Sequence, residues 1–286
     1  MCVTSSSAKL SETRILSFRL SEQKHLLAYT NKVENLSILP NSMILPVPGR
    51  LTEADFIDTS AYPGFMTEME HMLTPRSRGM TLGMTKGGGD SMRRSIKHFQ
   101  SGMYEVFIAD PNPFRGTGPM SGKSKIAERL VGKKHPIIEA LEVLEPINRP
   151  VVQERLLNFY DRYYPGWSLV VCVFGAGKAM ESQPIMFTYE PLEEWKDKTF
   201  FPGVDSHDGG APRLDEEVDV DHFLIAESQS GYTVPNGPKA PPQLVGRKFV
   251  GQKQDDTRMN GDWVGSVHES GSSFSAKFVR TTPRSA

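Results

Sequence analysis

Cysteine is almost absent from this sequence, which has only Cys2 and Cys172 among its 286 residues. Two cysteines cannot build the several disulfides that hold small secreted domains together. A chain of this length can bury a sizeable hydrophobic core and needs no such cross-links. The scarcity of cysteine is typical of a protein from a reducing compartment, so we expect a soluble, cytoplasmic protein.

Long apolar segments and an excess of one charge are also missing. The longest apolar run, LVVCVFGAG at 169–177, is far shorter than the roughly 20 residues that cross a bilayer. The N-terminus has no apolar signal core. The formal net charge is −1, which gives no electrostatic reason to bind nucleic acid or an anionic membrane. We therefore expect neither a membrane nor a nucleic acid as partner.

The segment FRGTGPMSGKSK at 114–125 has the composition of a phosphate-binding loop but not its spacing. Such a loop needs four residues between its first glycine and its Gly-Lys pair, because successive backbone N–H groups must surround a phosphate. Five residues separate Gly116 from Gly122, and three separate Gly118 from Gly122. Pro119 also removes one N–H donor. The sequence therefore predicts no nucleotide binding.

Alternating and continuous apolar patterns predict a strand-rich fold. The predicted strands are 14–20, 25–33, 42–48, 103–110, 167–177, 183–190 and 221–228. Helical spacing or capping predicts helices at 52–60, 62–73, 123–132 and 150–164. In the second of these, one face carries Phe65, Met69 and Met72, and in the last the inward-facing residues should be Val151, Val152, Leu156 and Phe159. Pro46 and Pro48 restrict the strand that contains them to a sheet edge or a strand end. We therefore expect an α+β fold with a mostly antiparallel sheet and two or three helices.

Residues 10–230 are predicted to form a single α+β domain, followed by a Pro/Gly/Ser-rich C-terminal extension at 231–286. The tail from residue 270 should be disordered unless something holds it. Residues 74–102 are rich in Gly, Ser and Arg, which indicates a mobile loop. This Arg/Gly-rich loop and the C-terminal extension are where we expect a protein partner to bind.

Histidine and aspartate are concentrated in the segments DSHDGG and DVDH. The cluster contains Asp205, His207, Asp208, Asp219, Asp221 and His222. Imidazole and carboxylate groups suit zinc or another divalent metal, and His207, Asp208, Asp221 and His222 are the candidate ligands of a metal-dependent hydrolase. No spacing matches a known metal motif, however. The alternative is turn architecture, in which Asp208 accepts N–H bonds beside Gly209 and Gly210 and His222 begins a strand.

Cys2 is a second candidate for catalysis. If Met1 is removed, the Cys2 thiol becomes an N-terminal nucleophile whose own α-amino group can act as base, as in an amidohydrolase. Against this, the residues that follow are polar and predict no strand at the nucleophile. The alternative is an ordinary N-terminus. Cys172 lies inside LVVCVF and is predicted to be a small core residue.

Several segments together resemble a family of uncharacterised bacterial proteins. Its members open with Met-Cys, carry an AMILPLP-like segment, and later show HDG followed by an Asp-His pair. The matching positions here are Cys2, the SMILP segment, His207, Asp208, Gly209, Asp221 and His222, with Ser42 where alanine is expected. The resemblance covers about residues 1–230 and implies one folded unit. The family has no established activity or cofactor, so it implies no mechanism.

No catalytic motif is complete in this sequence. We therefore expect a non-catalytic binding or structural component of a larger assembly. The two hydrolase hypotheses, one at the His207/His222 cluster and one at Cys2, remain as alternatives.

Overall fold

The computed structural model describes residues 3–74, 98–101, 103–110, 134–236, 240–267 and 274–278. Cys2, the segment at 114–125, the predicted helix at 123–132 and most of the predicted loop at 74–102 lie outside these residues.

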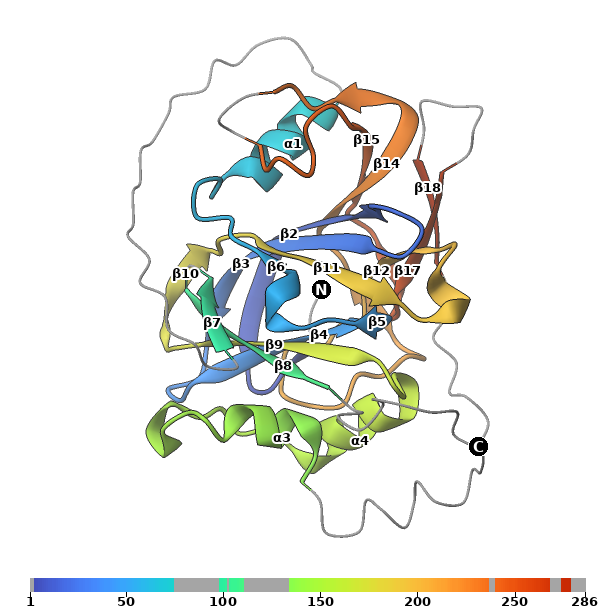
Figure 1. Ribbon diagram of the computed structural model, residues 1–286. Helices are drawn as coiled ribbons and strands as arrows, with labels where there is room; N and C mark the ends of the chain where they lie inside the picture. Colours follow the sequence, from blue (N-terminus) through green and yellow to red (C-terminus); the bar gives the residue numbers. More distant parts are fainter. Residues whose placement is uncertain are drawn as a thin grey trace, which may run out of the picture.

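The smaller of the two main sheets has five strands (Figure 1). Their order is β1 (Val3–Thr4), β4 (Asn41–Val47), β9 (Ser168–Phe174), β8 (Tyr104–Ala109) and β7 (His98–Ser101). Pro46 lies opposite Leu169 of β9, whereas β1 pairs only with Met43 and Ile44. Pro46 therefore occupies the end of β4 beyond β1, which confirms the expected position for a residue without an N–H group.

The larger sheet is built around β2 (Ala8–Arg19) and β3 (His25–Asn35). Its order is β15 (Lys248–Gln254), β14 (His222–Thr233), β2, β3, β11 (Ile185–Pro191) and β5 (Gly49–Arg50), with β10 (Gly177–Glu181) beside β3 and β6 (Phe56–Ile57) beside β11. Among the strand pairs that the structure describes, only β14 with β2 is parallel. The prediction of a mostly antiparallel α+β fold is confirmed.

Two small sheets complete the strands. One contains β12 (Thr199–Phe201), β17 (Trp263–Val267) and β18 (Phe274–Phe278), and the other β13 (Glu217–Asp219) and β16 (Thr257–Met259). The short 3-10 turns are η1 (Glu53–Asp55), η2 (Pro146–Asn148) and η3 (Glu193–Trp195).

Helices cover the outer faces of the two main sheets (Figure 1). Helix α1 (Phe65–Leu73) lies on the larger sheet, and α3 (Pro136–Leu141) and α4 (Glu154–Tyr163) lie on the opposite side of the molecule. Within the described residues, no helix is long and apolar enough to cross a membrane.

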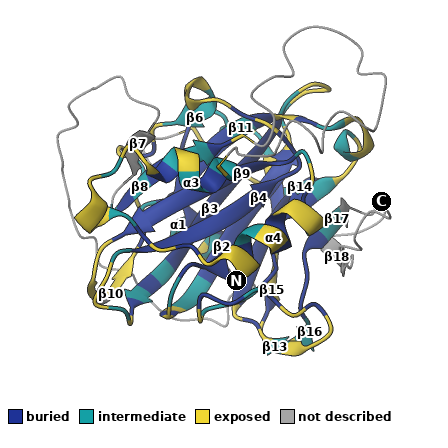
Figure 2. Cartoon of the chain, turned by 90° about the horizontal axis from the view of Figure 1, so that it is seen from below, coloured by how far each residue is buried: buried dark blue, intermediate teal, exposed yellow. Residues whose placement is uncertain are grey.

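Adjacent residues of the central strands face two different cores. Ile15 and Leu27 belong to the core that the two sheets share, whereas Leu16, Leu26 and Ala28 pack in the core beneath α1. Because successive strand residues point to opposite faces, a strand covered on both sides is apolar throughout. Figure 2 shows the resulting band of buried strands through the middle of the molecule.

The predicted helical faces are largely confirmed. Phe65 and Met69 of α1 are buried and Met72 is partly buried. Leu156 and Phe159 of α4 are buried as expected. Val152 is also buried as expected, whereas Val151 was expected to face inward and is 67 % exposed. Both residues precede α4, which begins at Glu154, so they do not share the face of that helix.

The expected helix at 52–60 is a single 3-10 turn, η1. The Asp55 carboxylate accepts the backbone N–H of Thr52 at 2.8 Å, and β6 follows at once. The capping signal at Thr52 was therefore present, but the chain leaves the helical conformation after one turn because residues 56–57 pair with β11.

The segment predicted as a C-terminal extension contributes to the sheets and the core. Residue 230 lies inside β14, and the next strand, β15, is an edge of the larger sheet. Phe249 and Trp263 are both fully buried. Residues 274–278 form β18, and antiparallel pairing with β17 holds this strand in place.

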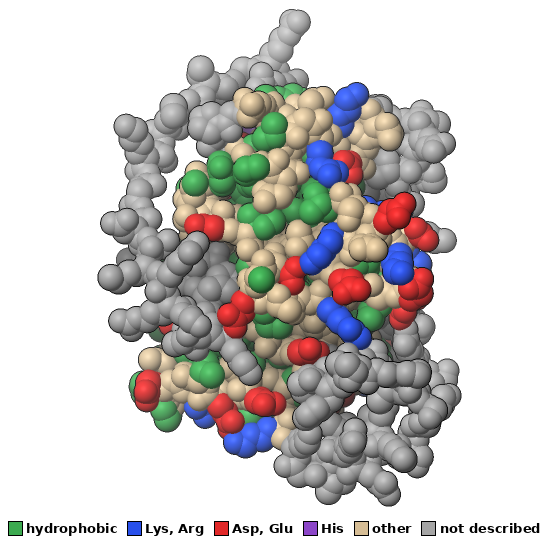
Figure 3. Space-filling view, viewed as in Figure 1, with side chains coloured by type: hydrophobic (Ala, Val, Ile, Leu, Met, Phe, Trp, Pro, Cys, Tyr) green, Lys and Arg blue, Asp and Glu red, His purple; other side chains and the backbone are tan. Residues whose placement is uncertain are grey.

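The surface carries both signs of charge. On the face shown in Figure 3, acidic and basic side chains are interspersed among apolar patches. On this face the described side chains form no broad field of one sign, in agreement with the net charge of −1.

Candidate functional site

The predicted His/Asp cluster lies where the N-terminal segment meets the loop of residues 203–210, here called the 203–210 loop. Val3 forms a parallel bridge with Ser206, and Ser7 forms an antiparallel bridge with Asp208. The Thr4 N–H donates to the Ser206 carbonyl at 2.9 Å, and the Ala8 N–H donates to the His207 carbonyl at the same distance. The first strand of the chain is thus fixed by residues about two hundred positions later.

Asn260 and Asp262 hold the other side of the 203–210 loop. Asn260 Oδ1 accepts the Asp205 N–H at 2.7 Å, and its Nδ2 donates to the Asp205 carbonyl at 2.8 Å. Asp262 Oδ1 accepts the N–H groups of Gly203 and Val204 at 2.7 and 3.2 Å. Both side chains are buried. They therefore provide hydrogen-bond partners for backbone groups of the loop that have none in a sheet.

The Asp262 carboxyl is the most unusual ionisable group of the site. Its Oδ2 accepts the Tyr164 hydroxyl at 2.8 Å, so three donors from two segments converge on one carboxyl group. Burial raises the pKa of Asp262 to about 6, although the hydrogen bonds from Gly203, Tyr164 and Val204 act in the opposite direction. The carboxyl group joins the C-terminal end of α4 to the 203–210 loop.

Asp208 adopts the role that the architectural alternative assigned to it. Its Oδ1 accepts the Gly210 N–H at 2.7 Å and the Ser206 hydroxyl at 3.0 Å. The hydrogen bond from Gly210 is the main reason that the pKa of Asp208 is lowered. Gly209 has φ +79°, and a Cβ there would lie 2.5 Å from the Ser5 carbonyl oxygen. The turn after His207 therefore requires glycine for both its conformation and its packing.

His207 and His222 have different surroundings. His207 Nε2 lies 2.7 Å from Asp205 Oδ1, and the His207 side chain is 29 % exposed. His222 begins β14, as predicted, and its buried ring packs on Trp263 with the ring centroids 5.4 Å apart. Burial holds the pKa of His222 well below its usual range, and the nearby His207 and Arg258 add to the effect. His222 is therefore neutral at physiological pH.

The remaining aspartates point to other partners. Asp221 Oδ2 accepts the Glu12 N–H at 3.0 Å, and Asp219 Oδ1 accepts the Thr257 hydroxyl at 2.5 Å. Within the described part of the chain, no group of three or more His, Cys, Asp or Glu side chains is arranged to hold a metal ion. The predicted ligands His207, Asp208, Asp221 and His222 are near in sequence but serve separate contacts.

Neither cysteine is a described member of this cluster. Cys2 lies outside the described residues, one position before the Val3 that bridges to Ser206. Cys172 of β9 is fully buried, which confirms its assignment to the core.

We expect EDTA to leave the midpoint of thermal unfolding unchanged. Asp208 already accepts two hydrogen bonds from its own turn, and the other carboxylates of the cluster serve different contacts. The residues that the structure describes therefore offer a metal no preformed set of ligands. Thermal unfolding with EDTA, and then with added zinc, tests this. A midpoint that falls with EDTA and recovers with zinc would contradict it.

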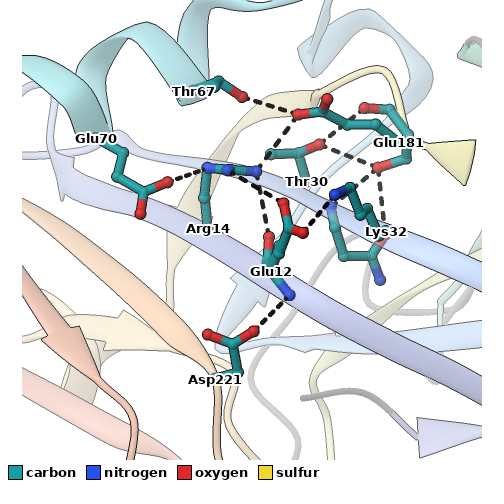
Figure 4. A network of polar contacts seen from close by, with 10 residues as sticks. Glu12, Arg14, Thr30, Lys32, Thr67, Glu70, Glu181 and Asp221 are labelled. Atoms are coloured by element: carbon teal, nitrogen blue, oxygen red, sulfur yellow. Dashed lines mark hydrogen bonds and ion pairs between the residues drawn. The ribbon is translucent and has the colours of Figure 1, made fainter. Parts of the chain in front are cut away.

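A second polar cluster was not predicted from the sequence. It surrounds Arg14 of β2, whose side chain is 8 % exposed and lies 2.5 Å from Glu70 of α1 (Figure 4). Arg14 also reaches Glu181 of β10 at 3.4 Å, and Glu181 accepts the Thr67 hydroxyl at 2.8 Å. Glu12 completes the cluster through an ion pair with Lys32 of β3.

The Arg14 cluster fixes α1 against the larger sheet. Glu12 has φ +49° at the register shift between Ser11 and Arg14, which is the left-handed conformation that non-glycine residues seldom adopt. The sequence shows only that the charged residues Glu12 and Arg14 are two positions apart. Their partners come from α1, β3 and β10, so no local signal could have identified the whole cluster.

Comparisons with known proteins give a limited result. No family model matches the chain, and no curated protein matches it. The chain is similar to the crystal structure of baculovirus P35, with a TM-score of 0.43 and 16 % identity, over 77 % of this chain and 65 % of that chain. It thus spans about two thirds of the P35 chain.

Two further P35 structures are similar at 16 % identity and a TM-score of 0.37. One is a mutated baculovirus P35 after caspase cleavage, matched over 76 % of this chain and 67 % of that chain. The other is the complex of P35 with caspase-8, matched over 76 % of this chain and 64 % of that chain.

Proposed function

We propose that this chain is a non-catalytic binding or structural component of a larger assembly. The supporting observation is that polar side chains of the predicted site are engaged in hydrogen bonds to the backbone. Asp208, Asn260 and Asp262 all hydrogen-bond to backbone groups and hold the 203–210 loop in place.

A general acid or base must present a proton or a lone pair to a substrate. The three donors on Asp262 occupy its two oxygens inside the core, where a substrate does not reach. His222 is buried against Trp263. The Asp205–His207 pair is partly exposed, and the hydroxyl of Ser206 between them donates to Asp208 and to the Gly210 carbonyl. The cluster is therefore better suited to holding three chain segments together.

The surface composition favours a protein partner over other ligands. A net charge of −1 with both signs interspersed gives little attraction to nucleic acid or to an anionic membrane. The Arg/Gly-rich loop at 74–102 and the residues after 230 remain proposed contact segments. Among the residues after 230, β15, β16, β17 and β18 belong to sheets. P35 itself forms a complex with caspase-8.

The native size of the protein tests this function. We expect the chain, isolated from its source cell under native conditions, to elute in a complex well above its own mass of 31.9 kDa. Size-exclusion chromatography with light scattering, followed by cross-linking and mass spectrometry, would measure the mass and identify the companion protein.

A hydrolase would give the opposite result. The chain would elute alone, and it would cleave an ester or amide from a substrate panel in a reaction abolished by His207→Ala. Those two findings together would overturn the proposed function.

A further inference from the structure

The connection between β16 and β17 contains a chemically labile dipeptide, Asn260-Gly261. The sequence has only one other Asn-Gly pair, Asn236-Gly237. Asn260 is 1 % exposed and Gly261 is buried, whereas Asn236 is exposed. The chain therefore carries the same dipeptide twice, once with its asparagine buried and once with its asparagine in solvent.

An Asn-Gly pair deamidates without an enzyme. The backbone nitrogen of the glycine attacks the carbon of the asparagine side-chain amide, and glycine has no side chain to obstruct this approach. A bond from that nitrogen to Cγ forms and the bond from Cγ to Nδ2 breaks, so that Nδ2 leaves as ammonia with the proton of the glycine N–H. Water then opens the cyclic imide to aspartate or isoaspartate. Water is the only co-reactant, so the surroundings of the asparagine decide its rate.

The native contacts hold the Asn260 amide away from this reaction. Its Oδ1 accepts the Asp205 N–H at 2.7 Å, and its Nδ2 donates to the Asp205 carbonyl at 2.8 Å. The backbone N–H of Asn260 also donates to the Glu216 carbonyl at 2.9 Å. Attack converts the planar amide into a tetrahedral centre, which cannot keep both bonds to Asp205. Because Asn260 is buried, water is also kept from the reacting atoms.

The product cannot restore these contacts. Aspartate at position 260 has no Nδ2 donor, so a carboxylate oxygen would face the Asp205 carbonyl oxygen that Nδ2 now binds. Asp262 is a second buried carboxyl group, two residues away in the same connection. A buried acceptor without a donor and an added buried charge both destabilise the closed 203–210 loop. Isoaspartate would also lengthen the backbone by one carbon atom.

We propose that Asn260 is a deamidation site that the closed 203–210 loop protects. While the loop is held, the amide stays intact. Once the loop opens, deamidation converts Asn260 and prevents the loop from closing again in its original form. The first strand bridges to the same loop through Val3 and Ser206, so the change also loosens the N-terminal segment. The inference concerns the chemical lifetime of the fold and does not rest on the proposed binding function.

The experiment uses the full chain, incubated in mildly alkaline buffer with and without denaturing urea. Peptide mass spectrometry follows deamidation at Asn260 and at Asn236 in the same samples, so Asn236 is the internal reference. Two variants then test the loop. Gly209→Ala strains it, because the Cβ atom would lie 2.5 Å from the Ser5 carbonyl oxygen. Gly246→Ala is the matched control, since Gly246 has φ +77° but no atom within 4 Å of where its Cβ would be.

In urea we expect the two asparagines to deamidate at rates within about threefold of each other, because neither is protected in an unfolded chain. In the native protein, Asn260 should deamidate at least about 100-fold more slowly than Asn236, since its reaction must wait for a local opening. Gly209→Ala should accelerate deamidation at Asn260 by about 10-fold, whereas Gly246→Ala should change it by less than about threefold.

The effect of the product is measured separately with Asn260→Asp. This variant should lower the midpoint of thermal unfolding by about 5 °C, because it removes a buried donor and adds a buried charge. Asn236→Asp is its control and should keep the midpoint of the wild type, since that side chain is exposed.

Three results would overturn the inference. Equal native rates at Asn260 and Asn236 would mean that the fold gives no protection. An Asn260 rate that Gly209→Ala and Gly246→Ala raise equally would mean that protection does not come from the loop. An Asn260→Asp variant as stable as the wild type would mean that the product closes the loop normally.

Discussion

Replacing Asp262 with alanine should lower the free energy of unfolding by about 4 kcal/mol, because each buried donor left without an acceptor costs about 1–3 kcal/mol. The variant would strand the N–H groups of Gly203 and Val204 and the hydroxyl of Tyr164. Asp262→Asn is the control. It keeps an oxygen for the two N–H groups, and the Tyr164 hydroxyl can rotate to accept from the new amide. Urea denaturation of the three proteins gives the comparison.

The wild type and Asp262→Asn should also differ in how their free energy of unfolding depends on pH. The pKa of Asp262 is about 6 in the folded chain and about 3.9 in an unfolded chain. Between these two pH values the folded state binds one more proton than the unfolded state. The contribution of Asp262 to the free energy of unfolding is therefore greatest below pH ~4 and falls by about 3 kcal/mol in total as the pH rises through ~6. Asp262→Asn has no such group and should lack this decline.

His222 must be separated from this effect. Its pKa is lowered in the folded state, so the unfolded chain binds the extra proton and stability rises with pH over part of the same range. The difference between wild type and Asp262→Asn removes the contribution of His222, since both proteins contain it. Identical pH profiles for the two proteins would contradict the role assigned to the Asp262 carboxyl.

Replacing Gly209 with alanine should lower the free energy of unfolding by about 3 kcal/mol, the sum of left-handed backbone strain and overpacking. The Cβ atom would lie 2.5 Å from the Ser5 oxygen and 3.0 Å from the Ser5 carbonyl carbon. Both are backbone atoms of the segment that carries the first strand, so they cannot move aside as a flexible side chain can.

Gly166 provides a matched control for Gly209. It has φ +80°, against +79° for Gly209, but no atom lies within 4 Å of where its Cβ would be. Gly166→Ala should therefore lower the free energy of unfolding by about 1 kcal/mol, from backbone strain alone. If chemical denaturation shows equal losses for both variants, close packing of the 203–210 loop against residue 5 is not what requires glycine there.

Strands with a regular apolar pattern could be predicted from the sequence, and short elements could not. β2, β3, β9, β11 and β14 each follow a clear pattern and were all expected. β10 has only five residues and owes its conformation to pairing with β3. α3 does carry a local signal, namely Pro136 at its first position, with the His135 ring accepting the Ile137 N–H.

The candidate site could be located from the sequence, but its role could not be determined. The turn after His207, the glycine requirement and the start of β14 at His222 are local features, and local patterns predict such features well. Asn260 and Asp262 lie about fifty residues further on, in a segment that shows no pattern of its own. Their contacts depend on how the whole chain packs, so the sequence left catalysis and architecture as open alternatives.

The bridge between the first strand and the 203–210 loop has a consequence for how the protein folds as it is synthesised. Thr4 and Ser206 are 202 positions apart and hydrogen-bonded to each other. On the ribosome, the β2–β3 hairpin can form as soon as its own residues emerge, while the neighbours that cover it have not yet been made. Contacts this distant in sequence slow folding and prolong the exposure of apolar strands. The nascent chain should therefore depend on chaperones at least until Ser206 has been translated and can pair with the first strand.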